Sequence, residues 1–131
     1  MKLPTPVGGT FVSVGVRVMT GGNICNAGKE DTKGYFFLVH ANSTYTITRG
    51  SQHILAAGAL PPSKFGLPRS GSLVGVTMDI AIEARDATIT TRLNGAVVAT
   101  VRDHSYPTGF ASLASGWHRT LYESVSVTQS L

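Results

Sequence analysis

The side chains of this sequence that could act as catalytic acids or bases begin with its seven carboxylates, which are Glu30, Asp31, Asp79, Glu83, Asp86, Asp103 and Glu123. Asp79 and Glu83 share one face of a predicted strand, because strand side chains alternate between faces. Four residues at roughly 3.3 Å each separate their Cα atoms by about 13 Å. The carboxyl pairs of glycosidases lie about 5–5.5 Å or about 6.5–9.5 Å apart. We therefore expect a solvated strand face here, not a catalytic pair.

Motifs for nucleophilic, phosphate and metal chemistry are absent or incomplete. There is no G-x-S-x-G elbow, and the four histidines stand singly without H-x-x-x-H spacing. Gly22 to Lys29 resembles a phosphate loop, but it is one residue too long, and Glu30 stands where Ser or Thr should bind magnesium. The lone Cys25 excludes an internal disulfide and a cysteine-based zinc cage. We predict no catalytic residue, no cofactor, no metal and no enzyme in this chain alone.

Strand-type alternation dominates the sequence. Every even position from Val12 to Val18 is Val, and apolar residues recur at every second position from Val74 to Ala84. Six inward positions at period two do not fit a helix, whose apolar period is 3.6. Tyr35 to Ala41 is apolar on both faces, which is typical of a central strand covered from both sides.

Turn residues connect these strands into hairpins. Asn42-Ser43 separates the apolar strand from 44–49, and Asn94-Gly95 joins 89–93 to 96–101 in the pattern of a type I′ turn. Two final strands are expected at 110–115 and 122–129, and proline-rich 60–71 is expected to be a loop. So many half-apolar strands predict an all-β fold, an antiparallel β-sandwich formed by residues 1–131 as one domain.

Composition and charge exclude several function classes. The chain is 42% hydrophobic and 14% charged, which argues against disorder. No apolar run reaches the roughly 18 residues of a transmembrane segment, and Met1 to Pro6 lacks the features of a signal peptide. The net charge of +4 comes from scattered basic residues without a nucleic-acid-binding motif. We expect a solvated basic surface and no nucleic acid partner, with weak attraction to anionic surfaces as the alternative.

Several segments together resemble the C-terminal lectin-like domain of galactocerebrosidases (glycoside hydrolase family 59). Residues 34–48, GYFFLVHANSTYTIT, resemble that domain's aromatic strand and its A-N-G-S-Y turn. Further segments follow in the same order and are Gly8 to Phe11, Arg17-Val18 with Gly21-Gly22, Val76 to Ile80, Leu93 to Gly95, Gly109 to Ala111 and Tyr122 to Val127. The resemblance implies a concanavalin-like or laminin-G-like jelly roll that borders a separate catalytic barrel. The barrel is absent from this sequence, so the hydrolytic activity does not transfer.

The sequence departs from that family in two ways. The family's domain begins several strands before Gly8, so the chain is an N-terminally truncated domain, a fragment or a compact relative. A sandwich that lacks strands exposes open edges, which favours a homodimer. The family's domain also binds a structural calcium. Glu123 occupies the position of the calcium ligand near the last strand, while the ligands from the early part of the domain have no counterpart in this sequence. Because Ca²⁺ needs six to eight oxygens, we predict no tightly held calcium.

Candidate sugar-binding residues combine an aromatic platform with fixed hydrogen-bond donors. Trp117, His118 and Arg119 offer both in a predicted loop, with Tyr122 nearby. The alternative role for Trp117, the only tryptophan, is to anchor the core or the loop. Further candidates on the predicted outer strand faces are Tyr45, Arg49 and Arg92. Asn42-Ser43-Thr44 is an N-glycosylation sequon at a predicted turn, which makes Asn42 a glycosylation candidate.

Three functions remain open at this level. The first is a non-catalytic carbohydrate-binding or glycosphingolipid-binding module whose partner is a glycan or a galactolipid headgroup. The second is a structural or self-association domain without sugar binding. The third is a fragment of a galactosylceramide-hydrolysing enzyme, with an upstream catalytic domain as its partner. The resemblance implies a lysosomal or secreted location.

Overall fold

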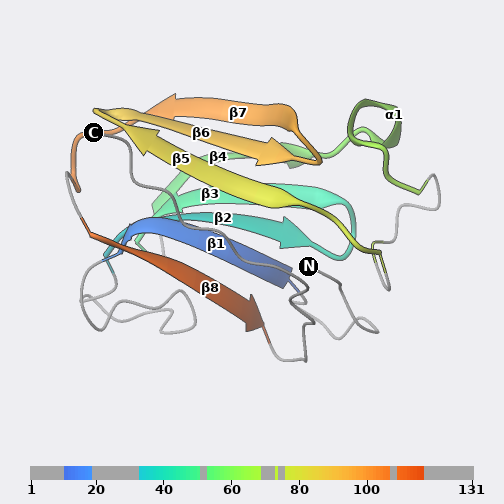
Figure 1. The fold of residues 1–131 in the computed structure, drawn as a ribbon, viewed down its shortest axis with the longest axis horizontal. Helices are drawn as coiled ribbons and strands as arrows, with labels where there is room; N and C mark the ends of the chain where they lie inside the picture. Colours follow the sequence, from blue (N-terminus) through green and yellow to red (C-terminus); the bar gives the residue numbers. More distant parts are fainter. Residues whose placement is uncertain are drawn as a thin grey trace.

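The computed structural model describes residues 11–18, 33–50, 53–68, 73, 76–106 and 109–116. Their elements are β1 (Phe11–Val18), β2 (Tyr35–His40), β3 (Thr44–Arg49), β4 (His53–Ala59), α1 (Pro62–Phe65), β5 (Ile80–Arg85), β6 (Thr88–Leu93), β7 (Ala96–Arg102) and β8 (Phe110–Gly116). The strands pair antiparallel in two sheets, of order β4-β3-β2-β1-β8 and β5-β6-β7. The smaller sheet lies across one face of the larger (Figure 1), which confirms the predicted all-β sandwich.

The middle strand of the larger sheet, β2, is the apolar segment predicted to be covered on both faces. Phe37 and Val39 point into the main core between the sheets, where they meet Val12 and Val14 of β1. Phe36 is also fully buried, although it lies on the opposite face of the strand. Burying an apolar side chain of this size stabilises a fold by about 1.5–3 kcal/mol. Side chains on both faces of β2 are therefore buried. The prediction of a central strand covered from both sides is confirmed.

The predicted hairpins are confirmed. Asn94 and Gly95 have φ values of 51° and 83°, as a type I′ turn between β6 and β7 requires. The β2–β3 connection turns through residues 41–43, with the Ser43 N–H donating to the His40 carbonyl at 3.1 Å.

The strand predicted from the alternation between Val74 and Ala84 is shorter than that alternation suggested. Met78 is buried and Asp79 exposed, so the alternation is real, but the regular ladder of β5 begins only at Ile80. Asn94 explains the late start, because its side-chain oxygen accepts from the Asp79 N–H at 2.8 Å and its own N–H donates to the Asp79 carbonyl at 2.7 Å. The turn residue Asn94 thus hydrogen-bonds both backbone groups of Asp79.

The edge strand β4 was missed by the sequence analysis. Its pairing with β3 also shows that the predicted position of Tyr45 was wrong. The strand reads HILAAGA, and Ala and Gly have little preference for strands. Gly58 of β4 pairs with Tyr45 of β3, and a Cβ at Gly58 would approach the Tyr45 ring to 3.2 Å. Tyr45 packs on the main core with its ring 6.3 Å from that of Phe37. It therefore lies on the inner face of the sheet, not on the predicted outer face.

A β-bulge in β1 redirects one side chain from the outer face of the sheet. The pairing of β1 with β8 shifts between Gly15 and Val18, and Arg17 adopts a left-handed φ of 53°. Without the bulge, alternation would place Arg17 on the outer face with Ser13 and Gly15. Gly109 makes the bulge possible, because a Cβ there would lie 2.6 Å from the Arg17 carbonyl oxygen.

We expect Gly109→Ala to lower the free energy of unfolding by about 2–4 kcal/mol, because the new methyl group meets backbone and not a movable side chain. Gly66→Ala is the matched control, since Gly66 also has a positive φ of 66° but has open space around its Cβ position. The control should cost about 1–2 kcal/mol. Equal losses in urea unfolding of the two variants would show that the contact with Arg17 contributes nothing.

Candidate functional site

A pocket of about 390 Å³ opens at one end of the sandwich, and its lining residues are Arg17, Asp86, Ala87, Arg102, His104 and Tyr106. They come from the end of β1, the β5–β6 turn, and the end of β7 with the segment after it. In Figure 1 the β5–β6 turn lies at the left end, and α1 lies at the right. Both sheets therefore contribute to this pocket.

Arg17 connects the two sheets at the pocket. Its Nη1 donates to the backbone carbonyl of Asp86 and, at 3.3 Å, to that of Tyr106. These contacts hold the guanidinium group beside the β5–β6 turn, where only the bulge of β1 lets it reach. The side chain is therefore ordered before any ligand arrives, which lowers the entropic cost of binding.

The β5–β6 turn carries a second left-handed residue. Asp86 has a φ of 52°, and the following Ala87 is buried, with its carbonyl accepting from the Asp103 N–H at 2.9 Å. Asn and Asp tolerate this region better than other non-glycine residues. Backbone strain of this kind gathers at binding sites, and both Arg17 and Asp86 line the pocket.

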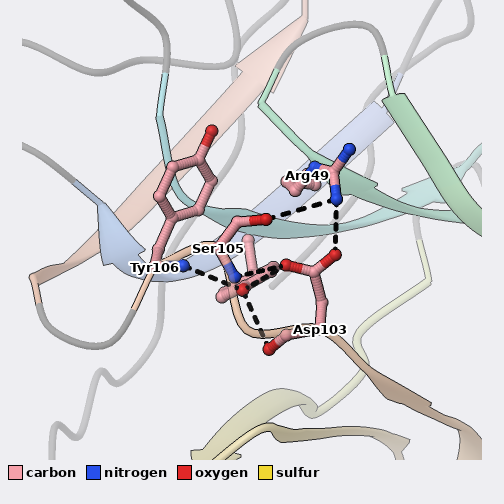
Figure 2. Close-up of polar contacts among 5 residues, drawn as sticks. Arg49, Asp103, Ser105 and Tyr106 are labelled. Atoms are coloured by element: carbon pink, nitrogen blue, oxygen red, sulfur yellow. Dashed lines mark hydrogen bonds and ion pairs between the residues drawn. The ribbon is translucent and has the colours of Figure 1, made fainter.

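An anchor cluster fixes the segment that follows β7, and we use this name for Tyr35, Arg49, Asp103 and Ser105. Asp103 Oδ1 accepts from the Tyr35 hydroxyl at 2.6 Å and from the Ser105 N–H at 2.8 Å, and Oδ2 accepts from Arg49 Nη1 at 2.7 Å. The Tyr106 N–H donates in turn to the Tyr35 oxygen at 3.1 Å. Figure 2 shows the bonds from Arg49 and Ser105 meeting at the Asp103 carboxylate, with the Tyr106 ring turned away from it.

The anchor cluster shifts the pKa values of two of its members. Burial of Asp103 would raise its pKa, but the hydrogen bonds from Tyr35, Ser105 and Arg49 outweigh it and hold the pKa well below the usual 3.8. Burial raises the pKa of the Tyr35 hydroxyl above 10.0, and the hydrogen bond to Asp103 raises it further. Asp103 is therefore ionised at neutral pH and its oxygens are hydrogen-bonded, which suits a structural role and not proton transfer.

The pocket presents several kinds of group that could bind a ligand. Arg17 and Arg102 supply donors, Asp86 supplies a carboxylate acceptor, and Tyr106 supplies an aromatic ring. The Tyr106 ring packs on Tyr35 with centroids 5.4 Å apart, which restricts its motion. Within the described ranges no three His, Cys, Asp or Glu side chains gather as metal ligands. None of the described helices has the length and apolar character to cross a membrane.

The structure separates the candidate residues chosen from the sequence. Arg49 belongs to the anchor cluster, while Arg92 pairs with Glu83 at 3.0 Å on the other sheet. The Glu83 side chain is thus engaged in an exposed ion pair, in line with the predicted solvated face. Asn42 is exposed in the β2–β3 turn, where its Oδ1 accepts from the Thr44 hydroxyl at 2.6 Å.

The other candidates lie outside the described residues, and they are Trp117, His118, Arg119 and Tyr122, together with Glu123 and the expected strand at 122–129. Their roles stay predictions.

The residues that line the pocket were missed by the sequence analysis. Asp86 was noted only as a carboxylate and His104 only as an isolated histidine, because no local spacing links them. A signal existed in the run from Arg102 to Tyr106, which gathers an arginine, an acid, a histidine and a tyrosine directly after a strand. Arg17 gave no such signal, because a bulge cannot be recognised from alternation alone.

Comparisons with known proteins support the fold. Neither a protein-family model nor a curated protein matches this sequence, so the resemblance to galactocerebrosidases gains no support from them. Among solved structures, the carbohydrate-binding module CBM66 from Bacillus subtilis is similar, with a TM-score of 0.56 and 13% sequence identity. The similarity covers 86% of this chain and 58% of that module. At this identity the likeness shows a shared β-sandwich fold.

We expect Asp103→Asn to lower the free energy of unfolding by about 2–3 kcal/mol near neutral pH, because it removes the charge that three donors share. Since folding lowers the pKa of Asp103, its contribution is complete above about pH 5 and is lost as the pH falls through the unfolded and then the folded pKa. The gap between wild type and variant should therefore narrow in acid, as urea unfolding at pH 7 and pH 3 would measure. The control is Asp79→Asn, whose side chain is exposed. An equal loss in both variants at pH 7 would contradict the anchor role.

Proposed function

We propose that this chain is a non-catalytic carbohydrate-binding module and that the pocket at the end of the sandwich is its binding site. The observation that carries the proposal is the pocket itself, which combines ordered donors, a carboxylate and an aromatic ring. The fold shared with a carbohydrate-binding module supports it.

The chemistry of the pocket suits a sugar. A pyranose or furanose ring presents a C–H face that packs on an aromatic ring such as that of Tyr106. Its hydroxyls donate to acceptors such as the Asp86 carboxylate and accept from guanidinium groups such as that of Arg17. A volume of about 390 Å³ falls within the size of small-molecule sites, and it matches one or two sugar residues at the end of a glycan.

A finer version of the proposal names a galactolipid headgroup as the ligand, with this chain serving a galactosylceramide-hydrolysing enzyme in the lysosome or outside the cell. Its support is the sequence resemblance centred on residues 34–48 and the sequon at Asn42. Asn42 lies in the turn after β2, whereas Tyr35 at the start of β2 contacts the pocket segment. A glycan on Asn42 would therefore stand at the other end of the sandwich and leave the pocket open.

We expect a glycan array that includes galactosylceramide to reveal bound sugars, and Tyr106→Ala to weaken that binding about tenfold, because a sugar–aromatic contact is lost while the backbone N–H of residue 106 remains. Trp117→Ala is the paired variant, since Trp117 is the binding candidate chosen from the sequence. Loss of binding in Trp117→Ala, with Tyr106→Ala unaffected, would contradict the assignment of binding to Tyr106. Silence across the whole array would overturn the proposal.

A second candidate function is self-association, and the observation that favours it is the edge strand β4. Among the described strands β4 pairs only with β3, and it carries no Asp, Glu, Lys or Arg. Edge strands of monomers are commonly protected by charges, because unpaired backbone groups attract other strands. Ile54 on this strand is 61% exposed. Antiparallel pairing of β4 with β4 of a second copy would cover it.

We expect sedimentation at increasing concentration to show a dimer if this second function holds, and Ile54→Lys to return it to a monomer by placing a charge on the edge. The control is Val97→Lys, which changes the other large exposed apolar side chain of the described residues and lies on β7. A monomer at all concentrations, or equal dissociation by both variants, would count against pairing through β4.

A further inference from the structure

The charges of the pocket are not balanced. The described residues contain five arginines, which are Arg17, Arg49, Arg85, Arg92 and Arg102. Arg49 pairs with Asp103, and both Arg85 and Arg92 pair with Glu83. The arginines that have no carboxylate partner within the described residues are Arg17 and Arg102, and both line the pocket. The two described arginines without a carboxylate partner thus lie in one place.

The guanidinium of Arg17 is prepared for an additional partner. Its Nη1 is occupied by the carbonyls of Asp86 and Tyr106. The Nε–H and Nη2–H groups have no hydrogen-bond partner within the described residues. A guanidinium presents its donors in a planar fork that matches a carboxylate or a sulfate. Because the carbonyls already hold Arg17 in place, an arriving anion would not have to order this side chain.

Asp86 limits what the pocket accepts. Its carboxylate would repel a ligand that carries negative charge over its whole surface. A ligand with one anionic group and several hydroxyls avoids this conflict, because the anionic group can meet the arginines while a hydroxyl donates to Asp86. Tyr106 adds an aromatic surface for the ring of such a ligand. An acidic sugar has this combination, and a free inorganic anion does not.

We propose that the pocket recognises an acidic sugar residue, carboxylated or sulfated, whose anionic group binds Arg17 and Arg102. This inference rests on the proposed carbohydrate-binding function and deepens it by naming the class of sugar. Arg17 positions the anionic group near the β5–β6 turn, and Arg102 contributes a second guanidinium from the end of β7. Asp86 selects for hydroxyls on the same sugar.

The experiment is a glycan array with matched sets, in which one neutral glycan also appears in sialylated, uronylated and sulfated forms. We expect the protein to bind at least one acidic form about tenfold more tightly than its neutral parent, as charge-assisted hydrogen bonds to arginine allow. The carboxylated and sulfated members then separate the two sources of charge. Binding to acidic members should weaken between 50 and 500 mM NaCl, because exposed charges are screened.

Two charge variants assign the preference to the pocket. Arg102→Gln should weaken binding of the acidic form about tenfold, and by clearly more than it weakens binding of the neutral parent. Asp86→Asn should tighten binding of the acidic form about threefold, since it removes a like charge, keeps an acceptor oxygen and tolerates the left-handed backbone. Arg85→Gln is the matched control, because the Arg85 side chain is 72% exposed, pairs with Glu83 and is not among the residues that line the pocket.

Each outcome decides between the two proposals. Preference for acidic members that Arg102→Gln abolishes and Arg85→Gln retains supports the inference. Equal binding of neutral and acidic members, or a preference unaffected by Arg102→Gln, overturns it and leaves the carbohydrate-binding function standing. No bound glycan of either kind overturns both. Binding of inorganic sulfate as tight as that of the sulfated glycan also overturns it, because the sugar would then contribute nothing.

Discussion

The carboxylate of Asp103 lies where three separate parts of the chain meet. Tyr35 begins the central strand, Arg49 ends the next strand, and Ser105 belongs to the segment after β7. One anion satisfied by three donors ties the two sheets together at the end that bears the pocket (Figure 2). A buried charge is costly unless it is fully hydrogen-bonded, so the cluster holds only as a complete set. His104 and Tyr106 reach the pocket because their neighbours are held in this way.

Irregular backbone does the rest of the positioning. The bulge in β1 turns Arg17 from the outer face toward the pocket, and it depends on a glycine at position 109. The tight β5–β6 turn offers the carbonyl of Asp86 to the guanidinium. Regular strands form the core, and the departures from regularity form the pocket. The bulge and the left-handed residues lower the stability of the fold, and the burial of β2 side chains on both faces offsets this loss.

The parts of the fold that could be predicted from sequence are those in which residue type and local spacing alone indicate whether a side chain is buried, exposed or in a turn. The alternation of β1, the doubly apolar β2 and the Asn94-Gly95 turn are local signals. The edge strand β4 was missed because its pairing comes from β3 and not from its own Ala and Gly residues. The candidate site was missed because it is assembled from distant segments. Arg49 illustrates this, since its partner Asp103 lies 54 residues away and turns a surface arginine into a structural one.

Because both sheets contribute to the pocket, a bound ligand would affect the stability of the whole sandwich. Arg17 extends from the five-stranded sheet, and Arg102 ends a strand of the three-stranded sheet. A ligand bound by both arginines would link the two sheets, so the sheets could separate only after the ligand dissociates. Occupancy then raises resistance to heat and proteolysis in proportion to the logarithm of ligand concentration. Under the proposed carbohydrate binding, the protein would be most stable where that sugar is most abundant.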